Sequence, residues 1–452
     1  MIKLSFYGGV REIGGNKILL EDNGTRIFLD FGKSFCAMNE YFGGYLTPRS
    51  VNGIGDYVEF DILPKLEGLY NRAMLNGSAI NYCEPKIDGV LISHPHIDHI
   101  GFLPFLDESI PVYCGEITKL IIDAIEESTA SSNFGEHVYK TFHTGDKLKI
   151  GSLEVEPIHV DHSTPGAYGY IIHTSIGAVV YTGDLRIHGT RNDMTEDFIA
   201  KASAAKPAVL ITEATRIMPE DTRKNFTEQG VYEESKRIIS QSNKLVMVTF
   251  YGRDLDRFKT LYAVAKECGR KFVISMKMAY LLNKVKEDLR FQIPDVLNDD
   301  VLLVYMRRKK SGEFVEKDYQ RWERMFLEKA VSYEYVRDNQ EKVIFNLDLF
   351  NFQELVDIKP EPDSDFIHSM SEPFSEDDIN DELMHKWIEH FNLKFHQVHA
   401  SGHCSGDEIR EMVERINPKT LIPIHTEYPE LLKGIIVDTL IVEKGKEYIL
   451  EK

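Results

Sequence analysis

Four side chains that can bind a metal ion fall within six consecutive positions after the apolar run at 89–93. They are His94, His96, Asp98 and His99, in the segment HPHIDH. A short apolar run of this kind predicts a buried strand. A strand end followed by a tight loop can turn several side chains toward one point, and histidine nitrogen and aspartate oxygen suit Zn²⁺ and also Mn²⁺. The segment predicts a metal site rather than an ordinary polar loop.

Three further residues of ligand type follow apolar runs later in the chain. They are His162 in VDHS, Asp184 in TGD and His425 in PIH. Taken alone, each has an ordinary structural interpretation. Their shared position after predicted strands favours the joint interpretation, because strand ends along one sheet edge converge in space. We therefore expect all three to lie near the HPHIDH segment.

The segment HASGH, at 399–403, immediately precedes a predicted helix. Ser405 and Glu408 form a capping-box pattern. The N–H groups at a helix N-terminus favour an anion, although an ordinary cap with buried histidines is the alternative. We expect hydrogen bonds to a bound phosphate group from His399, Ser401 and His403, with Gly402 in the same binding segment.

These motifs resemble those of the metallo-β-lactamase fold, with Asp30 in FLDFG as a further match. The opening GGVREIGGN, and HASGH followed by PIH, are similar to the β-CASP branch and specifically to ribonuclease J. The intervals from His162 to Asp184 and from His403 to His425 are both 22 residues, which fits that branch. The resemblance covers essentially the whole chain. It implies an α/β protein, in which a metallo-β-lactamase αββα sandwich is interrupted by an inserted β-CASP α/β domain.

The resemblance also implies two divalent metal ions, expected to be Zn²⁺ with Mn²⁺ as the alternative. The implied ligands of one ion are His94, His96 and His162. The implied ligands of the other are Asp98, His99 and His425, with Asp184 bridging the two ions. Asp30 would orient a ligand histidine from behind. Glu213 matches the acidic motif that opens the insert, where ribonuclease J usually has Asp.

Other positions give weaker expectations of phosphate or nucleic-acid contact. Arg253 lies between a predicted strand and a predicted helix, which suits phosphate binding, but a plain turn fits equally well. Ser369 and Ser371 match a stretch that the resemblance implies is part of a phosphate-holding loop, with a polar linker as the alternative. The basic run at 307–310 could guide single-stranded nucleic acid, although such runs are more often solvated surface.

Strand-like runs dominate the first half of the chain, and strands alternate with helices after about residue 213. Residues 17–21 and 25–30 predict a hairpin around the turn Asp22-Asn23-Gly24. We expect a long loop at 33–61, a helix at 64–75 and a connector at 359–383. The alternation after 213 predicts a mainly parallel sheet. The expected parts are the first metallo-β-lactamase segment at 1–212, the β-CASP domain at 213–375 and the C-terminal return at 376–452.

Composition limits the class of protein. The chain has 53 Lys and Arg against 72 Asp and Glu, a net charge of −19. This net charge argues against a protein that coats nucleic acid along its whole length. It is compatible with an enzyme that holds nucleic acid in one local channel. No apolar run approaches the ~18 residues of a membrane span, and no signal peptide is expected. The five cysteines include no CxxC pair, so a reducing cytoplasm is the expected compartment.

The combined expectation is a metal-dependent phosphodiesterase acting on single-stranded RNA. A 5′-to-3′ exoribonuclease is the main hypothesis, with endonuclease activity as an addition. Hydroxide activated by two metals would attack the scissile phosphate, Asp98 would orient it or take its proton, and His403 and His399 would stabilise the developing charge. The alternatives are a repair-type DNA nuclease and a hydrolase of a small thioester or lactone. The 27 residues after His425 match the short, archaeal type of ribonuclease J, and a homodimer is compatible with it.

Overall fold

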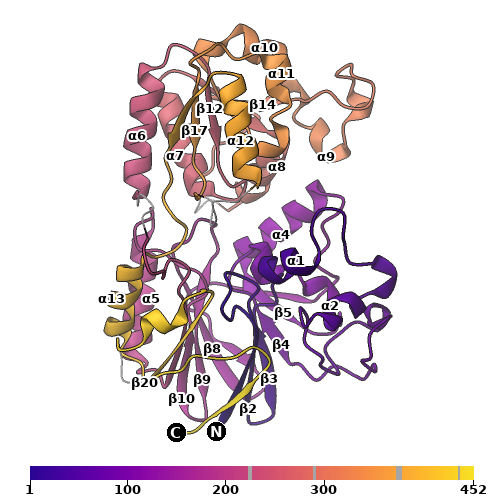
Figure 1. Ribbon diagram of the computed structural model, residues 1–452, viewed down its shortest axis with the longest axis vertical. Helices are drawn as coiled ribbons and strands as arrows, with labels where there is room; N and C mark the ends of the chain where they lie inside the picture. Colours follow the sequence, from indigo (N-terminus) through magenta and orange to yellow (C-terminus); the bar gives the residue numbers. More distant parts are fainter. Residues whose placement is uncertain (222–225, 289–291, 373–378, 436–437) are drawn as a thin grey trace.

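The computed structural model describes residues 1–221, 226–288, 292–372, 379–435 and 438–452, and these contain three seven-stranded sheets. Two of the sheets lie in the lower part of the molecule in Figure 1, and the third lies in the upper part. Within the described residues, no helix is both long and apolar enough to span a membrane.

The first sheet has the order β21-β1-β2-β3-β4-β5-β6. Its half from β21 to β3 is antiparallel and its half from β3 to β6 is parallel. The predicted hairpin is confirmed, because Asp22 pairs with Thr25 across the turn. The strands are β1 (Ile2–Gly8), β2 (Lys17–Asp22), β3 (Thr25–Leu29), β4 (Gly89–Leu91), β5 (Val112–Gly115), β6 (Tyr139–Phe142) and β21 (Glu447–Leu450).

The second sheet has the order β20-β19-β11-β10-β9-β8-β7. Strands β20 to β10 are parallel, and β10 to β7 are antiparallel. The strands are β7 (Leu148–Ile150), β8 (Leu153–His159), β9 (Tyr168–Thr174), β10 (Gly177–Tyr181), β11 (Val209–Glu213), β19 (Thr420–Ile424) and β20 (Asp438–Thr439).

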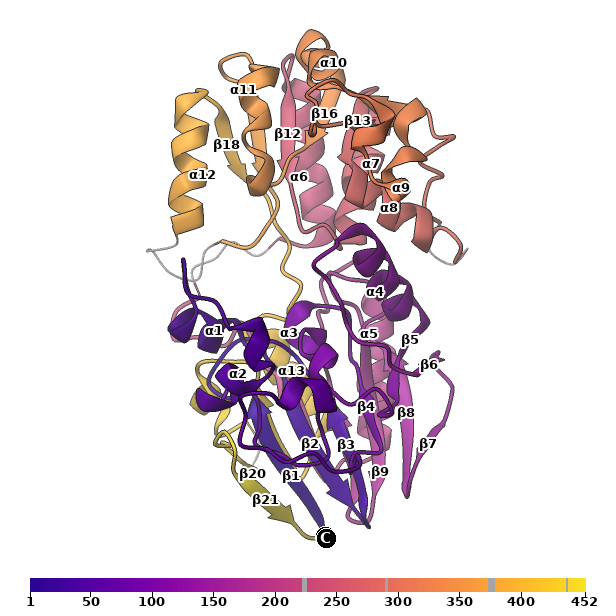
Figure 2. The ribbon, with the colours of Figure 1, turned by 90° about the vertical axis from the view of Figure 1, so that its right-hand side faces the viewer.

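These two sheets pack face to face, with helices on both outer faces. Leu4 and Ile18 of the first sheet join Ile172 and Ile211 of the second in one fully buried cluster. The outer face of the second sheet is covered by α5 (Asn192–Ala204) and α13 (Gly406–Ile416), through a cluster that includes Phe198. The outer face of the first sheet, nearer the viewer in Figure 2, is covered by α1 (Phe35–Tyr41), α2 (Gly55–Glu59) and one side of α4 (Glu116–Ser128), through a cluster that includes Met38, Val58 and Ile122. The predicted αββα sandwich is therefore confirmed.

The third sheet is parallel throughout and has the order β15-β14-β13-β16-β12-β17-β18. Alternate residues of β12 face opposite sides: Val248 packs with helices α6 to α8, and Met247 with α11 and α12. The strands are β12 (Val246–Thr249), β13 (Lys271–Ser275), β14 (Leu302–Tyr305), β15 (Ala330–Val331), β16 (Val343–Asn346), β17 (Asp365–His368) and β18 (Lys394–Gln397). The helices are α6 (Glu228–Gln241), α7 (Leu255–Glu267), α8 (Met276–Val285), α9 (Arg321–Arg324), α10 (Tyr333–Asp338), α11 (Glu354–Ile358) and α12 (Ile379–His390).

The inserted domain extends further along the chain than its expected end at residue 375. Strand β18 pairs with β17, so the third sheet continues to Gln397. The expected connector at 359–383 is also wrong in part, because β17 lies inside the sheet with Phe366 and Ile367 fully buried. Its acidic, proline-containing flanks conceal a strand of only four residues. Residues 373–378, which include Pro373, lie outside the described residues.

Two expectations for the first 75 residues also need correction. The expected loop at 33–61 contains α1 (Phe35–Tyr41) and α2 (Gly55–Glu59). The helix expected at 64–75 is absent from this described segment, apart from a 3₁₀ turn at Arg72–Leu75. Gly68 adopts a φ of 70°, and Tyr70 forms a β-bridge with Leu106. These backbone conformations cannot continue a helix.

Candidate metal centre and cavity

The candidate ligands come from four strand ends in the two central sheets. After β4 come His94 and His96, and then the helical turn α3 (Ile97–Ile100), which contains Asp98 and His99. The other three ligands, His162, Asp184 and His425, follow β8, β10 and β19. His425 has a φ of 54°, and its backbone N–H donates to the carbonyl of Gly9 at 2.7 Å. The sheets are joined beside the site, where Tyr168 N–H donates to the carbonyl of Ser93 at 2.9 Å. All seven predicted ligands are thereby brought together.

The first group of ligand atoms belongs to His94, His96, His162 and Asp184, which all lie within 4.8 Å of one another. Nδ1 of His96 is 3.0 Å from Nε2 of His94 and 3.3 Å from Nε2 of His162. Nitrogens bound to one tetrahedral zinc ion at about 2.0–2.1 Å lie about 3.3 Å apart. Nδ1 of His96 therefore lies from each of the other two nitrogens at the separation expected of ligands to a single ion.

The second group belongs to Asp98, His99, His425 and Asp184. Nε2 of His99 lies 3.2 Å from Oδ2 of Asp184, and Nε2 of His425 lies 3.2 Å from Oδ2 of Asp98. Nε2 of His99 and Oδ1 of Asp184 are buried polar atoms without a hydrogen-bond partner among the described residues. Such atoms are costly unless something binds them. Asp184 is common to both groups, so the residues present could hold a divalent ion in each group.

Asp30 fixes one of these ligands from behind. Its fully buried carboxylate accepts hydrogen bonds from Nδ1 of His99 at 2.8 Å, from the backbone N–H and hydroxyl of Ser93 at 2.7 and 2.8 Å, and from the hydroxyl of Tyr181 at 2.5 Å. Because Nδ1 of His99 donates to Asp30, Nε2 is left with its lone pair for a metal. Tyr181 is a supporting residue that reasoning from the sequence missed.

Two glycines of the motifs provide space for this arrangement. Gly14, with a φ of 81°, lies so close to Asp98 that an added Cβ would be 2.6 Å from its Oδ2. At Gly402, an added Cβ would be 2.8 Å from the hydroxyl oxygen of Ser163. The carbonyl of Gly402 accepts a hydrogen bond from Nδ1 of His162 at 2.6 Å. Gly402, expected at the substrate, therefore also supports a ligand.

Electrostatics differ between the two ligand groups. Burial, together with neighbouring histidines, holds the pKa values of His94 and His96 well below the ordinary value and lowers that of His162 to about 4. Burial also opposes the protonation of His425, but the carboxylates of Asp184 and Asp98 outweigh it and raise the pKa of His425 to about 9. The three histidines of the first group are thus neutral and ready to bind a cation, whereas His425 in the second group is held cationic by two carboxylates.

Glu213 and His403 form a hydrogen-bonded pair beside Asp184. Nδ1 of His403 donates to Oε2 of Glu213 at 2.9 Å, and Oε1 of Glu213 accepts from the N–H of Leu185 at 2.8 Å. Thr215, which the sequence analysis did not single out, donates to Glu213 at 2.6 Å and lies 2.8 Å from Nδ1 of His425. Burial disfavours the charged form of His403, but Glu213 outweighs it and raises the pKa of His403. The pair favours a cationic His403 next to the ligands.

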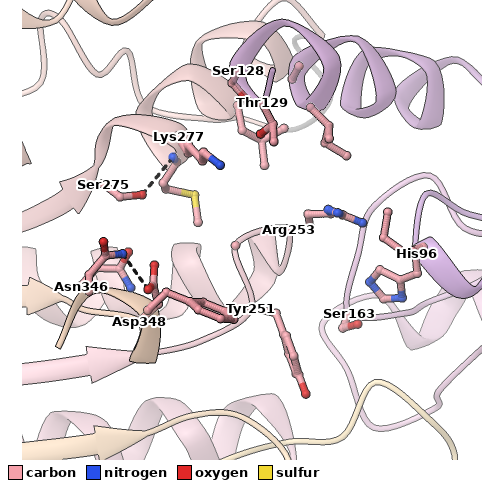
Figure 3. A pocket seen from close by; sticks show the side chains of 18 of the residues that line it. His96, Ser128, Thr129, Ser163, Tyr251, Arg253, Ser275, Lys277, Asn346 and Asp348 are labelled. Atoms are coloured by element: carbon pink, nitrogen blue, oxygen red, sulfur yellow. Dashed lines mark hydrogen bonds between the residues drawn. The ribbon is translucent and has the colours of Figure 1, made fainter. Parts of the chain in front are cut away.

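A cavity of about 1130 Å³ connects the ligands with the inserted domain. Ser275 and Asn346, at the carboxyl ends of β13 and β16, line its far side with Lys277 (Figure 3). Figure 3 also shows Arg253 extending toward His96, and the Arg253 guanidinium donates to the carbonyl of Pro95 at 2.8 Å. The predicted residues that line the cavity are Asp98, Arg253, Ser371, His399, Ser401, Gly402 and His403, together with the ligands His96, Asp184 and His425.

Ser369 does not line this cavity, and the structure corrects its expected role at a phosphate. It is fully buried, its hydroxyl donates to the carbonyl of Val398 at 2.5 Å, and its N–H donates to the carbonyl of Thr249 at 2.8 Å. Because its donors are used internally, it holds the backbone together instead. Ser371 does face the cavity, where its hydroxyl lies 3.0 Å from that of Tyr251.

The basic run at 307–310 is only partly available to a polyanion. Arg307 and Lys309 both line the cavity. However, both carboxylate oxygens of Glu323 accept hydrogen bonds from Lys309 at 2.6 Å, and Arg308 is paired with Asp357. The neighbouring acids therefore offset much of its positive charge.

Two family domains match parts of the chain. Residues 69–232 match the beta-lactamase superfamily domain, and residues 389–433 match the Zn-dependent metallo-hydrolase RNA specificity domain. The first match contains six of the seven ligands, and the second contains the HASGH segment and the remaining ligand, His425.

Known proteins are similar over most of the chain. Ribonuclease J 2 of Streptococcus pyogenes serotype M3 is 25% identical over 441 residues, which cover 95% of this chain and 70% of that protein. Ribonuclease J of Helicobacter pylori is 22% identical over 454 residues, covering 94% of this chain and 56% of the relative. For ribonuclease J of Thermus thermophilus the identity is 24%, over 76% of this chain and 58% of the relative. The chain thus spans little more than half the length of two of these relatives.

A solved structure has the same fold. The crystal structure of a protein of unknown function from Enterococcus faecalis superposes with a TM-score of 0.77 at 22% identity, covering 99% of this chain and 100% of that chain. Motifs, domain matches and similarity over most of the chain agree with one another. The two domain matches and the similarity to ribonucleases J over most of the chain support a ribonuclease J-like member of the β-CASP metallo-β-lactamase family of metal-dependent hydrolases.

Proposed function

We propose that this protein is a two-metal phosphodiesterase that degrades single-stranded RNA from the 5′ end, with endonuclease activity as an addition. One observation carries the proposal: the carboxylate of Asp184 belongs to two groups of ligand atoms at one end of the interdomain cavity. Similarity to ribonucleases J and to an RNA specificity domain favours RNA as the substrate.

Bound divalent ions, for which zinc suits the donor set, would supply Lewis acidity and a water of lowered pKa. The carboxylate of Asp98 lines the cavity 3.2 Å from Nε2 of His425 and would orient that water or take its proton. Cationic His403, held by Glu213, would donate a hydrogen bond to the scissile phosphate as its charge develops. His399 faces the same cavity and would be a second donor.

The cavity favours a polymer over a small ester or lactone. Its volume of about 1130 Å³ exceeds the ~300–1,000 Å³ of common small-molecule pockets. Arg253 lies close to the ligands, where burial lowers its pKa to about 10 and so leaves it cationic near pH 7. Arg253 and Ser371 are the candidates for holding a terminal 5′-phosphate.

The decisive experiment is digestion of matched RNA and DNA oligonucleotides with 5′ labels, in the presence of Zn²⁺ or Mn²⁺, resolved by product length. We expect labelled mononucleotides to appear first from RNA. Preferential cleavage of DNA would favour the repair-type nuclease. With the same RNA labelled at its 3′ end, early release of labelled mononucleotides would contradict the 5′-to-3′ direction but not the proposed metal centre.

A further inference from the structure

A second arginine, Arg257 on α7, lies behind the cavity and is fully buried. Its guanidinium donates to the carbonyl of Ser369 at 2.9 Å, to the hydroxyl of Ser369 and to the carbonyl of Ala400 at 3.2 Å. It also lies 3.3 Å from Nδ1 of His399. One side chain therefore joins the end of β17 to the segment that carries His399.

These contacts determine where the ring of His399 sits. Nδ1 of His399 lies 3.1 Å from the carbonyl of Ser369, which itself accepts from Arg257. Because the Arg257 guanidinium can only donate, Nδ1 accepts from it, and the single proton of the neutral ring lies on Nε2, the nitrogen left for the cavity that the ring lines. Burial and the adjacent Arg257 cation hold the pKa of His399 well below its ordinary value, so the ring is neutral. The contribution of His399 to stabilising the phosphate then depends on the orientation of its ring rather than on a positive charge.

Arg257 is connected in turn to the metal centre. Oε1 of Glu228 accepts from Arg257 at 2.8 Å and from Arg186 at 3.0 Å. Arg186 follows the ligand Asp184 by two positions and also donates to Asp161, which directly precedes the ligand His162, at 3.1 Å. Arg186, Arg257 and Glu228 are all at most 3% exposed.

The three residues form a continuous bridge between the domains. Arg186 belongs to the sandwich, whereas Glu228 and Arg257 belong to the inserted domain. Removing one partner of a buried ion pair leaves an uncompensated charge, which is strongly destabilising. The bridge therefore resists movement of the HASGH segment relative to the loops that carry Asp184 and His162.

We propose that Arg257 is a positioning residue that holds His399 at the phosphate, and that Glu228 couples this position to the metal loops through Arg186. The inference rests on the proposed function, because it requires a phosphate in the cavity. A purely structural Arg257 would stabilise the fold without acting through His399. The two roles predict different behaviour when His399 is absent.

The test is a double-mutant cycle with Arg257→Met and His399→Ala, measured on 5′-monophosphorylated RNA. In the presence of His399, Arg257→Met should lower kcat roughly 10²-fold, the scale of a misplaced catalytic group, while KM changes little. In the His399→Ala background, it should lower kcat by less than about twofold, since coupled residues are not additive. Equal losses in both backgrounds would overturn the proposal.

Arg270→Met is a matched control. Arg270 is another buried arginine of the inserted domain. It donates to the carbonyl of Lys244, just before β12, at 2.9 Å and to the carbonyl of Val343, the first residue of β16, at 3.2 Å. The Arg270→Met variant should have a lower melting temperature than the wild type and a nearly unchanged kcat.

If Arg257→Met does not fold, Glu228→Gln and Arg257→Lys replace it in the same cycle, with the same two outcomes. Wild-type turnover in His399→Ala alone would also overturn the inference, whereas the digestion of RNA by the unmodified protein tests the proposed function separately.

Discussion

On the sandwich side of the cavity, Asp184 is 2% exposed and belongs to both ligand groups, and Asp30 and Glu213 hold its neighbours by hydrogen bonds. On the inserted-domain side, Phe350 is 88% exposed and Tyr251 is 44% exposed, and Lys277 is exposed as well. Buried side chains with fixed partners are preorganised for chemistry. Exposed rings and cations instead suit a flexible polymer that must enter and leave. The difference predicts effects on turnover from one side and on binding from the other.

The largest effect should come from the shared carboxylate. Asp184→Asn keeps the shape of the side chain but removes the charge that both ligand groups share. We expect at least about 10³-fold lower turnover, a loss of several kcal/mol. Elemental analysis should find more than one Zn or Mn per wild-type chain and less in the variant. Glu156→Gln, in the exposed group of Glu154, Glu156 and His173, is the control that should change neither quantity. Full activity of Asp184→Asn after chelation would refute the metal mechanism.

The next largest effect is expected from two further substitutions on the sandwich side of the cavity, which should reduce turnover without unfolding the protein. Asp98→Asn and His403→Ala should each lower kcat by roughly 10²-fold, the scale of one acid–base or charge-stabilising group. Both side chains reach the cavity, so both variants should keep the native fold, but His403→Ala leaves the buried Glu213 without its partner and should lower the melting temperature. Steady-state kinetics and thermal unfolding test both statements. Near wild-type turnover in His403→Ala would remove this residue from the phosphate role.

A smaller effect is expected from the cation that reaches from the inserted domain to the ligands. Arg253→Gln removes the charge of a side chain that makes a hydrogen bond to the backbone at Pro95. KM for RNA should rise about tenfold, the scale of 1.4 kcal/mol of lost binding, with little change in kcat. Lys277→Gln, further from the ligands in Figure 3, should raise KM less. A fall in kcat at constant KM would place Arg253 among the groups that act in the transition state.

The smallest effect compares two serines that lie two positions apart. RNA with a 5′-monophosphate should be degraded several-fold faster than RNA with a 5′-triphosphate, because the latter adds bulk and charge at Ser371 and Arg253. Ser371→Val should reduce this preference more than it reduces internal cleavage. Ser369→Ala should leave the preference intact and lower the free energy of unfolding by about 1 kcal/mol, the usual scale for a lost buried hydrogen bond. If Ser369→Ala instead reduced the end preference and left the free energy of unfolding in urea unchanged, Ser369 would be a phosphate contact after all.

The types of ligand and the alternation of strands and helices could both be predicted from the residues themselves. HPHIDH is a local pattern after an apolar run, and the helix–strand alternation of the insert is also local, so neither depends on distant contacts for its interpretation. The hairpin around Asp22-Asn23-Gly24 is determined in the same way by turn chemistry. The expected helix at 64–75 failed because its backbone is set by a bridge between Tyr70 and Leu106, 36 positions apart.

The partners of these residues follow from long-range packing. Ser369 and Ser371 are indistinguishable as sequence, yet one bonds to Val398 inside the protein and the other faces the cavity. Glu228 meets Arg186 and Arg257 across separations of 42 and 29 residues. Such contacts depend on how whole domains pack, and local propensity contains no information about them. The ligands can be predicted because local chemistry identifies them, whereas the groups that orient them are found only after long-range packing has brought distant segments together.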